Sequence, residues 1–468
     1  MLYTKNDLIT ALKNEIIQQN LQKITVDEIV IDSRKALQNK LFIALKGENN
    51  DGHNFLNQAF ENGCEVAIIH DIKYFTENQN RNLILVKNTF QTLYELADFA
   101  RKRSKAKIIA ITGSVGKTGT KEMLRIAFQS QAKTYATSGN LNNHYGLPLT
   151  LCNMPLDTEF AILEIGMNHL NEIEPLAKLA KPHLAVITQI TSAHIGNFKN
   201  EDEIALAKSE IFCGLDNKGL VVINRDDKYH DFLKKRAMNF GVSEENIFSF
   251  GKNEKSHYHL KSIDIKNLQI SEIEVEIQNK NEISYKIASA HKAVIFNSLI
   301  VVASLDLFNK INGLQALKDI EVAKGRGNVF AIEIAGKKIM IIDDSYNANM
   351  ASMQSALEYL SDLKITLNKK RAIAILGDMF ELGEKSAEIH EEVLRFVNVK
   401  SIDLLLLAGQ YFKEATKILD KNFKIYLNSR EIALNIKNLI EDGDILLIKG
   451  SRSMKMEEAL QGLIPNIT

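Results

Sequence analysis

The sequence has few residues of the kinds that mark secreted or metal-rich proteins. Its 468 residues include three cysteines, five prolines and no tryptophan. Cys64, Cys152 and Cys213 are far apart and odd in number, which fits neither a disulfide framework nor the spacing of a metal site. We therefore expect three buried thiols in a protein of the reducing cytoplasm.

Long apolar runs and an excess of charge of either sign are also missing. No run approaches the roughly 18 apolar residues of a membrane span, and the start MLYTKNDLITALKNEII is too polar for the core of a signal peptide. Basic and acidic residues both number 58, so no net field favours nucleic acid or an anionic membrane. The composition is that of a soluble globular protein.

What the sequence does contain is a regular alternation of short apolar runs with amphipathic helical segments. The runs KIIAIT, EFAILEIG and HLAVITQI are each followed by a helical stretch, and the run GLVVIN comes next, which predicts a mainly parallel sheet covered on both faces. An alternating stretch from Tyr258 to Lys280 predicts a β excursion with hairpin character, and an apolar helix follows it. The same α/β rhythm resumes after residue 324, and 468 residues are too many for one core.

The stretch IIAITGSVGKTGTKEML, Ile108 to Leu124, has the layout of a strand, a glycine loop and a helix start. The usual phosphate-loop pattern requires glycine where Ile111 stands, so this loop is two residues short. Its glycines would still let backbone N–H groups approach phosphate oxygens, and the helix N-terminus adds a favourable dipole. We interpret the segment as a nucleotide-binding loop made of Thr112, Gly113, Ser114, Val115, Gly116, Lys117 and Thr118.

Three further residues lie where the ends of parallel strands form ligand sites. Glu164 ends the run FAILEIG and is either a Mg²⁺ ligand or a solvent-facing acid. His194 follows the next strand and is either a ligand or polar surface. Lys208 shares a helix face with apolar residues, so it either snorkels to water or is desolvated. A desolvated, neutral amine could react with CO₂ to give a carbamate, which is an anionic oxygen ligand.

The segment VINRDD offers a different interpretation. Asn224 to Asp227 loosely fits the N-[KR]-x-D pattern with which many GTPases read guanine. The match is short, and no suitably placed D-x-x-G segment precedes it. A polar turn at the end of a strand is the simpler interpretation.

Taken in order, these motifs resemble the Mur ligase family of ATP-dependent peptide-bond-forming enzymes. The family's shortened phosphate loop, T-G-[ST]-x-G-K-[TS], is matched by Thr112 to Thr118. Within the family, the chain is similar to the branch that adds D-Ala-D-Ala to UDP-MurNAc-tripeptide. The segments that carry this similarity are IDSRKALQNKLFIALKGENNDGHNF, TSGNLNNHYGLPLTL, LEIGMN, IDDSYNAN, LGDMFELGE and IKGSRSMKMEE.

The resemblance implies an α/β protein of three domains. We expect a small α/β domain that binds UDP at residues 1–103, a central P-loop ATPase with a mainly parallel sheet at 104–323, and a Rossmann-like domain at 324–468. The charged segment Phe99 to Lys107 and the resumed rhythm after residue 324 suggest the same breaks.

The resemblance also implies a reaction in cytoplasmic peptidoglycan precursor synthesis. ATP would activate the tripeptide carboxylate as an acyl phosphate, which the amine of D-Ala-D-Ala then attacks. The implied cofactors are ATP and two Mg²⁺ ions, with a carbamylated Lys208. The implied partners are UDP-MurNAc-tripeptide and D-Ala-D-Ala, without nucleic acid or membrane insertion, and the implied state is a monomer.

Family motifs suggest a role for each matched residue. Lys117 would neutralise the β- and γ-phosphates, Thr118 and Glu164 would bind the first Mg²⁺, and His194 and carbamylated Lys208 would serve the second. Residues expected at ATP from other segments are Asn297, Arg326, Asp344 and Asn347. Residues expected at the UDP substrate are Ser33, Arg34, Lys46, Asn140, Asn142 and Asn143.

Some features depart from the family pattern or leave the choice open. Gly119 stands where a second threonine is common, and Met350 replaces a frequent proline. His291 lies six residues before Asn297 instead of four, so we do not assign it to the site. A sister ligase that adds one amino acid, folylpolyglutamate synthetase and a GTP-gated binding switch are the alternatives. The third residue of the tripeptide, diaminopimelate or lysine, is not readable from the sequence.

Overall fold

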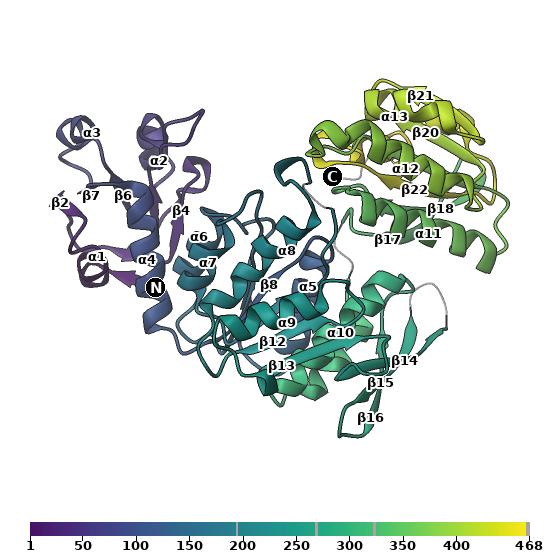
Figure 1. Ribbon diagram of the computed structural model, residues 1–468. Coiled ribbons are helices and arrows are strands. Elements are labelled where there is room, and N and C mark those ends of the chain that lie inside the picture. The colour runs from purple at the N-terminus through teal and green to yellow at the C-terminus, as the bar shows by residue number, and fades with distance from the viewer. Residues whose placement is uncertain (193–194, 267–269, 322–323, 465–468) are drawn as a thin grey trace.

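A computed structural model describes residues 1–192, 195–266, 270–321 and 324–464. Three α/β parts follow one another along the chain, each built around its own sheet (Figure 1). In the described ranges, no helix is long and apolar enough to cross a membrane.

The N-terminal part contains a five-stranded sheet in the order β2-β7-β6-β5-β4. All its neighbours are parallel except β2 and β7. The strands are β2 (Ile16–Gln19), β4 (Glu28–Val30), β5 (Lys40–Ile43), β6 (Val66–Ile69) and β7 (Leu83–Val86), with β1 (Tyr3–Thr4) and β3 (Thr25–Val26) forming a separate antiparallel pair. The helices are α1 (Lys5–Ala11), α2 (Leu56–Glu61), α3 (Ile72–Glu77) and α4 (Thr89–Arg103).

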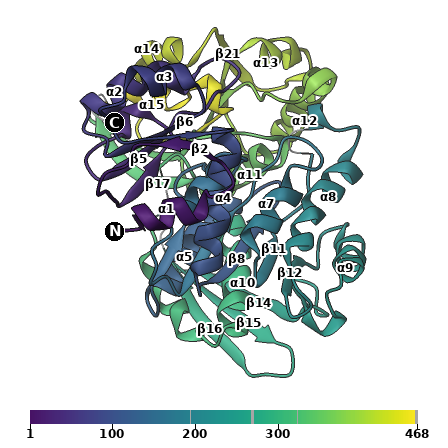
Figure 2. The ribbon, with the colours of Figure 1, turned by 90° about the vertical axis from the view of Figure 1, so that its left-hand side faces the viewer.

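The central part has nine strands in the order β16-β15-β14-β13-β12-β11-β8-β10-β9. Pairing is parallel from β9 to β14, and β14, β15 and β16 pair antiparallel, as the alternating stretch predicted. These three strands project at one edge of the sheet (Figure 2). The strands are β8 (Lys107–Thr112), β9 (Thr134–Ala136), β10 (Phe160–Glu164), β11 (Leu184–Ile187), β12 (Leu220–Asn224), β13 (Ile247–Gly251), β14 (Tyr258–Ile265), β15 (Ser271–Ile277) and β16 (Glu282–Ile287).

The helices of the central part cover both faces of its sheet. They are α5 (Lys117–Gln129), α6 (Gly146–Cys152), α7 (Ile173–Ala180), α8 (Glu201–Ser209), α9 (His230–Asn239) and α10 (Lys292–Leu307). Strand β8 shows why both faces need cover, because Ile108 and Ala110 enter one hydrophobic core while Ile109 and Ile111 enter another. A strand buried on both sides requires a continuous apolar run, which is what the sequence has there.

The C-terminal part contains six strands in the order β17-β18-β22-β19-β20-β21. Within residues 324–464, only β17 and β18 pair antiparallel. The strands are β17 (Asn328–Ile334), β18 (Lys337–Asp344), β19 (Ala372–Gly377), β20 (Leu404–Ala408), β21 (Asn422–Tyr426) and β22 (Ile445–Lys449). The helices are α11 (Met350–Thr366), α12 (Ser386–Asn398), α13 (Gln410–Ala415), α14 (Ser429–Leu439) and α15 (Glu457–Gln461).

The predicted fold class, α/β with mostly parallel sheets, is therefore confirmed. The domain boundaries near residues 104 and 324 stay predictions. The expected burial of the thiols holds for Cys64 and Cys152, whereas Cys213 is half-buried. Burial raises the pKa of Cys64 and of Cys213 to about 11.

Candidate active site

The glycine loop connects β8 to α5 and can be formed only with glycine at two positions. Gly113 has φ 150° and Gly116 has φ 82°. A Cβ atom at position 113 would lie 1.9 Å from Thr188 Oγ1. The loop therefore keeps its backbone free of side chains, as a phosphate cradle requires.

The loop is held in place by the segment that follows β11. Ser114 N–H donates to the Gln189 carbonyl at 2.7 Å, and Ser114 Oγ both donates to the Thr191 carbonyl and accepts from Thr191 N–H, each at 3.0 Å. Thr188 Oγ1 donates to the Val115 carbonyl at 2.6 Å. The shortened loop is thus fixed by bonds within the protein itself.

Lys117 begins α5, and its ammonium donates to the Gly113 carbonyl at 2.7 Å. Burial lowers the pKa of Lys117, the Glu164 carboxylate raises it, and the positive charge of Arg326 lowers it further. Three predicted site residues from separate segments therefore interact electrostatically. Thr118 follows Lys117 on the helix and is half-buried.

Glu164 lies at the end of β10 with one satisfied oxygen and one free one. Its Oε1 accepts from Asn142 Nδ2 at 2.8 Å, while Oε2 is buried without a hydrogen-bond partner in the described structure. Asn142 thus bonds to Glu164, and its predicted place at the UDP substrate stays a prediction. A buried carboxylate oxygen beside a phosphate loop fits Mg²⁺, which takes one or two carboxylates along with phosphates and waters.

Lys208 lies on α8 and is 1% exposed. Its ammonium makes no hydrogen bond or ion pair with any described residue. Burial lowers the pKa of Lys208 well below its usual value, and the charge of Lys117 lowers it further. Of the two interpretations from sequence, desolvation is the one that the structure supports. His194 lies outside the described residues.

Asn297 lies on α10 and packs against the phosphate loop. A Cβ atom at Gly116 would lie 2.4 Å from Asn297 Nδ2. His291 instead caps the start of α10, where its Nδ1 accepts from Ala293 N–H at 3.1 Å. Its ring contacts Tyr359 at 4.5 Å between centroids, and burial lowers its pKa. The helix cap accounts for His291 without a ligand role.

The residues predicted from the C-terminal part are joined by a lysine that sequence reasoning missed. Lys449 forms an ion pair with Asp344 at 2.6 Å and donates to the Asn347 carbonyl at 2.9 Å. The Arg326 guanidinium lies 3.9 Å from the centroid of the Tyr346 ring. The position of Lys449, at the end of the apolar run ILLIK, was the signal that could have identified it.

The other residues predicted at the UDP substrate bond to their own neighbours. Ser33 Oγ donates to Gln58 Oε1 at 2.7 Å, and Arg34, with its side chain 80% exposed, pairs with Asp32 at 2.8 Å. Asn143 Oδ1 accepts from two backbone N–H groups at the start of α6. Lys46 and Asn140 are exposed. Within the described residues, no hydrogen bond joins these five to the phosphate loop.

The loop from Lys46 to His53 is pinned by a histidine that sequence reasoning did not single out. His53 is 1% exposed, and its Nδ1 lies 2.6 Å from Asp51 Oδ1. Its Nε2 accepts from His70 N–H at 3.0 Å, so Nδ1 carries the proton in this geometry. The chain of contacts fixes the loop to the end of β6.

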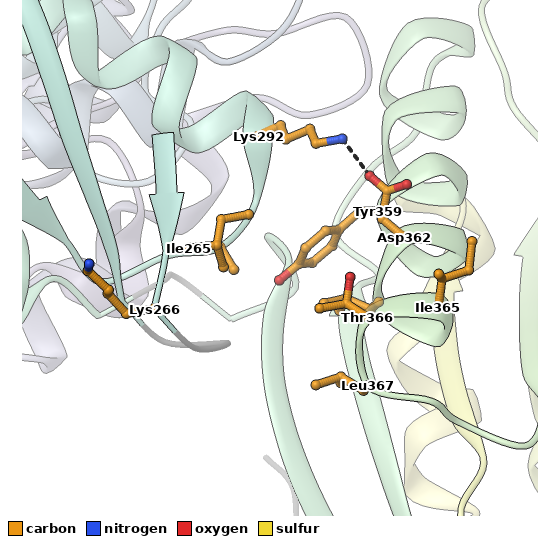
Figure 3. A pocket seen from close by; sticks show the side chains of 10 residues that line it. Ile265, Lys266, Lys292, Tyr359, Asp362, Ile365, Thr366 and Leu367 are labelled. Atoms are coloured by element: carbon orange, nitrogen blue, oxygen red, sulfur yellow. Dashed lines mark hydrogen bonds and ion pairs between the residues drawn. The ribbon is translucent and has the colours of Figure 1, made fainter. Parts of the chain in front are cut away.

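A separate cavity of about 860 Å³ lies between the central and C-terminal parts (Figure 3). Ile265 on one side faces Tyr359 and Thr366 on the other, and the ion pair between Lys292 and Asp362 crosses beside them at 2.6 Å. None of the predicted site residues lines this cavity.

The segment Asn224 to Asp227 is a turn whose acceptors are used internally. Asn224 Oδ1 accepts from Asp226 N–H, and the Asp226 carboxylate accepts from two backbone N–H groups after β13. Asp227 accepts from Ile190 N–H at 2.7 Å and from Tyr229 N–H at 2.9 Å. These contacts support the interpretation as a structural turn.

Comparison with known proteins covers almost the whole chain. Three family models match: "Mur ligase family, catalytic domain" at residues 25–101, "Mur ligase middle domain" at 111–305 and "Mur ligase, glutamate ligase domain" at 325–452. The UDP-N-acetylmuramoyl-tripeptide–D-alanyl-D-alanine ligase of Rickettsia prowazekii is 34% identical over 463 residues, which are 98% of this chain and 99% of that protein.

Solved structures agree with these matches. A crystal structure of MurF from Acinetobacter baumannii superposes with a TM-score of 0.86 at 30% identity and covers 99% of both chains. MurF from Thermotoga maritima in complex with ADP gives a TM-score of 0.79 at 27% identity, covering 94% of this chain and 98% of that one.

Proposed function

The chain belongs to the Mur ligase family, and we propose that it joins D-Ala-D-Ala to UDP-MurNAc-tripeptide while converting ATP to ADP and phosphate. One observation carries the chemistry. A phosphate loop with Lys117 lies beside a buried carboxylate oxygen of Glu164 that has no described partner. The Rickettsia and Acinetobacter relatives support the choice of substrates, and the Thermotoga structure with ADP supports the choice of nucleotide.

The reaction needs an activated carboxylate, because hydroxide is a poor leaving group. A terminal carboxylate oxygen of the tripeptide attacks the γ-phosphorus, and the bond from that phosphorus to the oxygen bridging the β-phosphate breaks. The amine nitrogen of D-Ala-D-Ala then attacks the acyl carbon, loses a proton and expels phosphate. Two anions must meet in the first step, so positively charged groups and positioning supply the catalysis.

The residues of this chain divide that task. Lys117 neutralises the β- and γ-phosphates from the central part, and Arg326 approaches the γ-phosphate from the C-terminal part. Asn297 contacts the adenine, and Asp344 and Asn347 bring the C-terminal part to the nucleotide. Asn142 orients Glu164 through its hydrogen bond to Oε1.

The donor set fits Mg²⁺ at one edge of the site. Glu164 Oε2 and the Thr118 hydroxyl would hold the ion with phosphate oxygens and water. When bound, Mg²⁺ draws negative charge from the phosphates as they react. Among the described residues, no three histidine, cysteine, aspartate or glutamate side chains gather as a metal site. A site that relies on phosphates fits that result.

Lys208 is the candidate for carbamylation. Its neutral amine would add to CO₂ and release a proton, which gives an anionic oxygen ligand for a second Mg²⁺ together with His194. Lys208→Ala should lower kcat by about 10²-fold, and acetate or another short carboxylic acid should partly restore activity by supplying the missing carboxylate. Full activity without added acid would contradict the carbamate.

We place the UDP end of the substrate at the N-terminal part, with Ser33, Arg34 and Lys46 as its contacts there and Asn140, Asn142 and Asn143 as its contacts from the central part. The pinned loop that ends at His53 supports this choice, because a fixed loop presents its backbone in one geometry. The reaction would take place in the cytoplasm, where its nucleotide substrates are made. A monomeric state stays a prediction.

Phosphate release in the presence of ATP tests the proposal. It should require both UDP-MurNAc-tripeptide and D-Ala-D-Ala, and the product should be the UDP-linked pentapeptide by mass. Separate assays with diaminopimelate and lysine tripeptides would identify the third residue. A free amino acid replacing the dipeptide would indicate a sister ligase, or folylpolyglutamate synthetase if a folate is the acceptor. Hydrolysis of GTP in preference to ATP, without either substrate, would indicate a GTP-gated switch. The carboxylates of Asp226 and Asp227 already accept hydrogen bonds within the protein, which disfavours their binding guanine.

A further inference from the structure

The central and C-terminal parts touch through their backbones at two glycines. Gly196 lies in the short 3₁₀ helix Ile195–Asn197, and Gly383 begins another at Gly383–Lys385. Gly196 N–H donates to the Glu381 carbonyl at 3.0 Å. A Cβ atom at Gly196 would lie 2.5 Å from Gly383 N, and a Cβ atom at Gly383 would lie 3.0 Å from Gly196 Cα. Backbone atoms cannot move aside as a flexible side chain can, so this approach requires glycine.

The C-terminal side of the contact is a shaped turn. Glu381 and Gly383 both have left-handed backbones, with φ 62° and 59°, which is uncommon for a glutamate. Phe380 N–H donates to Ser451 Oγ at 2.9 Å, and Met379 N–H donates to His390 Nε2 at 3.0 Å. These bonds hold the turn so that the Glu381 carbonyl faces Gly196.

Each side of the contact leads to residues that we place at the nucleotide. On the central side, the segment after β11 is bonded to the phosphate loop through Ser114 and Thr191. On the C-terminal side, Ser451 precedes Arg452, whose N–H donates to Asn347 Oδ1 at 3.2 Å. The Arg452 guanidinium also lies over the Tyr346 ring, which the Arg326 guanidinium contacts as well. Described bonds thus join the phosphate loop to Thr191, five residues before Gly196, and described contacts lead from Ser451 through Arg452 and Tyr346 to Arg326.

We propose that Gly196 and Gly383 are positioning residues that set how closely Arg326 and Asn347 approach the phosphate loop. The inference rests on the proposed function, in which Lys117 and Arg326 act on the same γ-phosphate. Reacting groups must be placed within a fraction of an ångström, and a contact between two backbones can fix the distance between the two parts that closely. The Lys292–Asp362 ion pair also joins the two parts, but its side chains are 61% and 40% exposed and can follow a shift.

Two substitutions test the contact without disturbing the rest of either part. Gly196→Ala adds one methyl group at a position outside the left-handed region, so the loop itself tolerates it. Gly383→Asn uses a residue that accepts the left-handed conformation. Asn197→Ala is the control for the first, because it changes an exposed neighbour. Gly336→Asn is the control for the second, because Gly336 has φ 73° and open space around it.

We expect both test variants to lower kcat for phosphate release by about 10- to 100-fold, as overpacking against a fixed backbone would. The KM for UDP-MurNAc-tripeptide should change by no more than about twofold, because the N-terminal part is not involved. Small-angle X-ray scattering with bound ADP should give a larger radius of gyration for both. Both controls should match the parent protein.

Several outcomes would overturn the proposal. One is a Gly196→Ala protein with the parent kcat and scattering curve. Another is lost activity with unchanged scattering, which would point to a local effect on the segment after β11. If the parent protein releases no phosphate with its substrates, the proposed function fails instead. The scattering comparison then still tests the contact, because it needs no activity.

Discussion

The carboxyl edges of the central and C-terminal sheets both carry buried polar residues. Several polar atoms at the central edge lack hydrogen-bond partners in the described structure, whereas those at the C-terminal edge have them. At the central edge, Glu164 Oε2 and Thr112 Oγ1 are buried without a described partner. Lys208 on α8 is 1% exposed and close enough to Lys117 for that charge to lower its pKa, and its ammonium bonds to no described residue. At the C-terminal edge, Lys449 is as deeply buried but bonds to Asp344 and Asn347. A buried polar group without a partner reduces stability, whereas a bonded one contributes to it. The comparison indicates that the central edge leaves polar groups free for a ligand, whereas the C-terminal edge holds its own polar groups rigidly through Lys449.

The largest effect that would test the comparison is expected at Lys117. Lys117→Ala should lower kcat by about 10³-fold, because the γ-phosphate loses its nearest positive charge while two anions approach. Phosphate release at saturating substrates measures it. Lys133→Ala is the control, since that lysine is exposed and its ammonium pairs with Asp157. A loss below about tenfold would mean that Lys117 does not act on the reacting phosphate.

The next test compares two buried lysines of the central part. Lys208→Met should lower kcat by about 10²-fold yet raise the free energy of unfolding, because it removes an amine without a described partner. Lys121→Met should lower that free energy, since Lys121 is also 1% exposed but bonds to the Thr137 carbonyl at 2.7 Å and to Glu122 at 2.9 Å. Urea unfolding measures both. Equal destabilisation by the two substitutions would contradict the comparison.

A third test addresses the C-terminal edge. Asp344→Asn should lower the free energy of unfolding by about 2 kcal/mol, because buried Lys449 loses its counter-charge but keeps its bond to the Asn347 carbonyl. Asp362→Asn breaks an exposed pair and should cost at most about 1 kcal/mol. Thermal or urea unfolding distinguishes the two. If Asp344→Asn has no effect on stability, the C-terminal edge is not the rigid one.

The smallest effect concerns the opposite end of the central sheet. His183 Nδ1 accepts from Ile108 N–H at 3.0 Å, and burial lowers the pKa of His183 to about 4. The unfolded chain therefore binds this proton more readily, and stability present above pH 6.5 is lost as pH falls toward 4. From about pH 7 to about pH 5.5 we expect a loss of about 1 kcal/mol. His183→Gln keeps an acceptor but does not titrate, so its unfolding free energy should fall less over that range.

The fold was predictable where local pattern and tertiary structure agree. Runs such as KIIAIT and HLAVITQI became strands in the interior of a sheet, because burial on both faces demands a continuous apolar sequence. Several strands were not predicted, among them β9, β13, β17 and β21. Of these four, β9, β17 and β21 lie at sheet edges, where polar residues are tolerated and the apolar pattern is weaker, whereas β13 lies between β12 and β14. An edge strand is specified by its partner more than by its own sequence.

The candidate site was predictable in its residue types but not in its partners. The spacing around Gly116 and Lys117 is enough by itself to indicate a nucleotide loop. The bond from Asn142 to Glu164 could not be foreseen, because it joins segments 22 residues apart through the ends of different elements. The same holds for Lys449, whose partner Asp344 lies 105 residues away. Pairing at such separations is set by the sheet order, which sequence periodicity does not reveal.

The electrostatic repulsion between Lys117 and Arg326 determines how the protein should respond to salt. The two positive charges come from different parts of the protein, and the charge of Arg326 lowers the pKa of Lys117. Without a nucleotide they repel, which favours separation of the two parts; a polyphosphate between them turns the repulsion into attraction. Dissolved ions screen both interactions at distances near about 10 Å. Raising the ionic strength should therefore weaken the repulsion in the free protein, which helps the two parts to approach each other. It should also weaken the attraction of both charges to the nucleotide, which lowers the affinity for ATP.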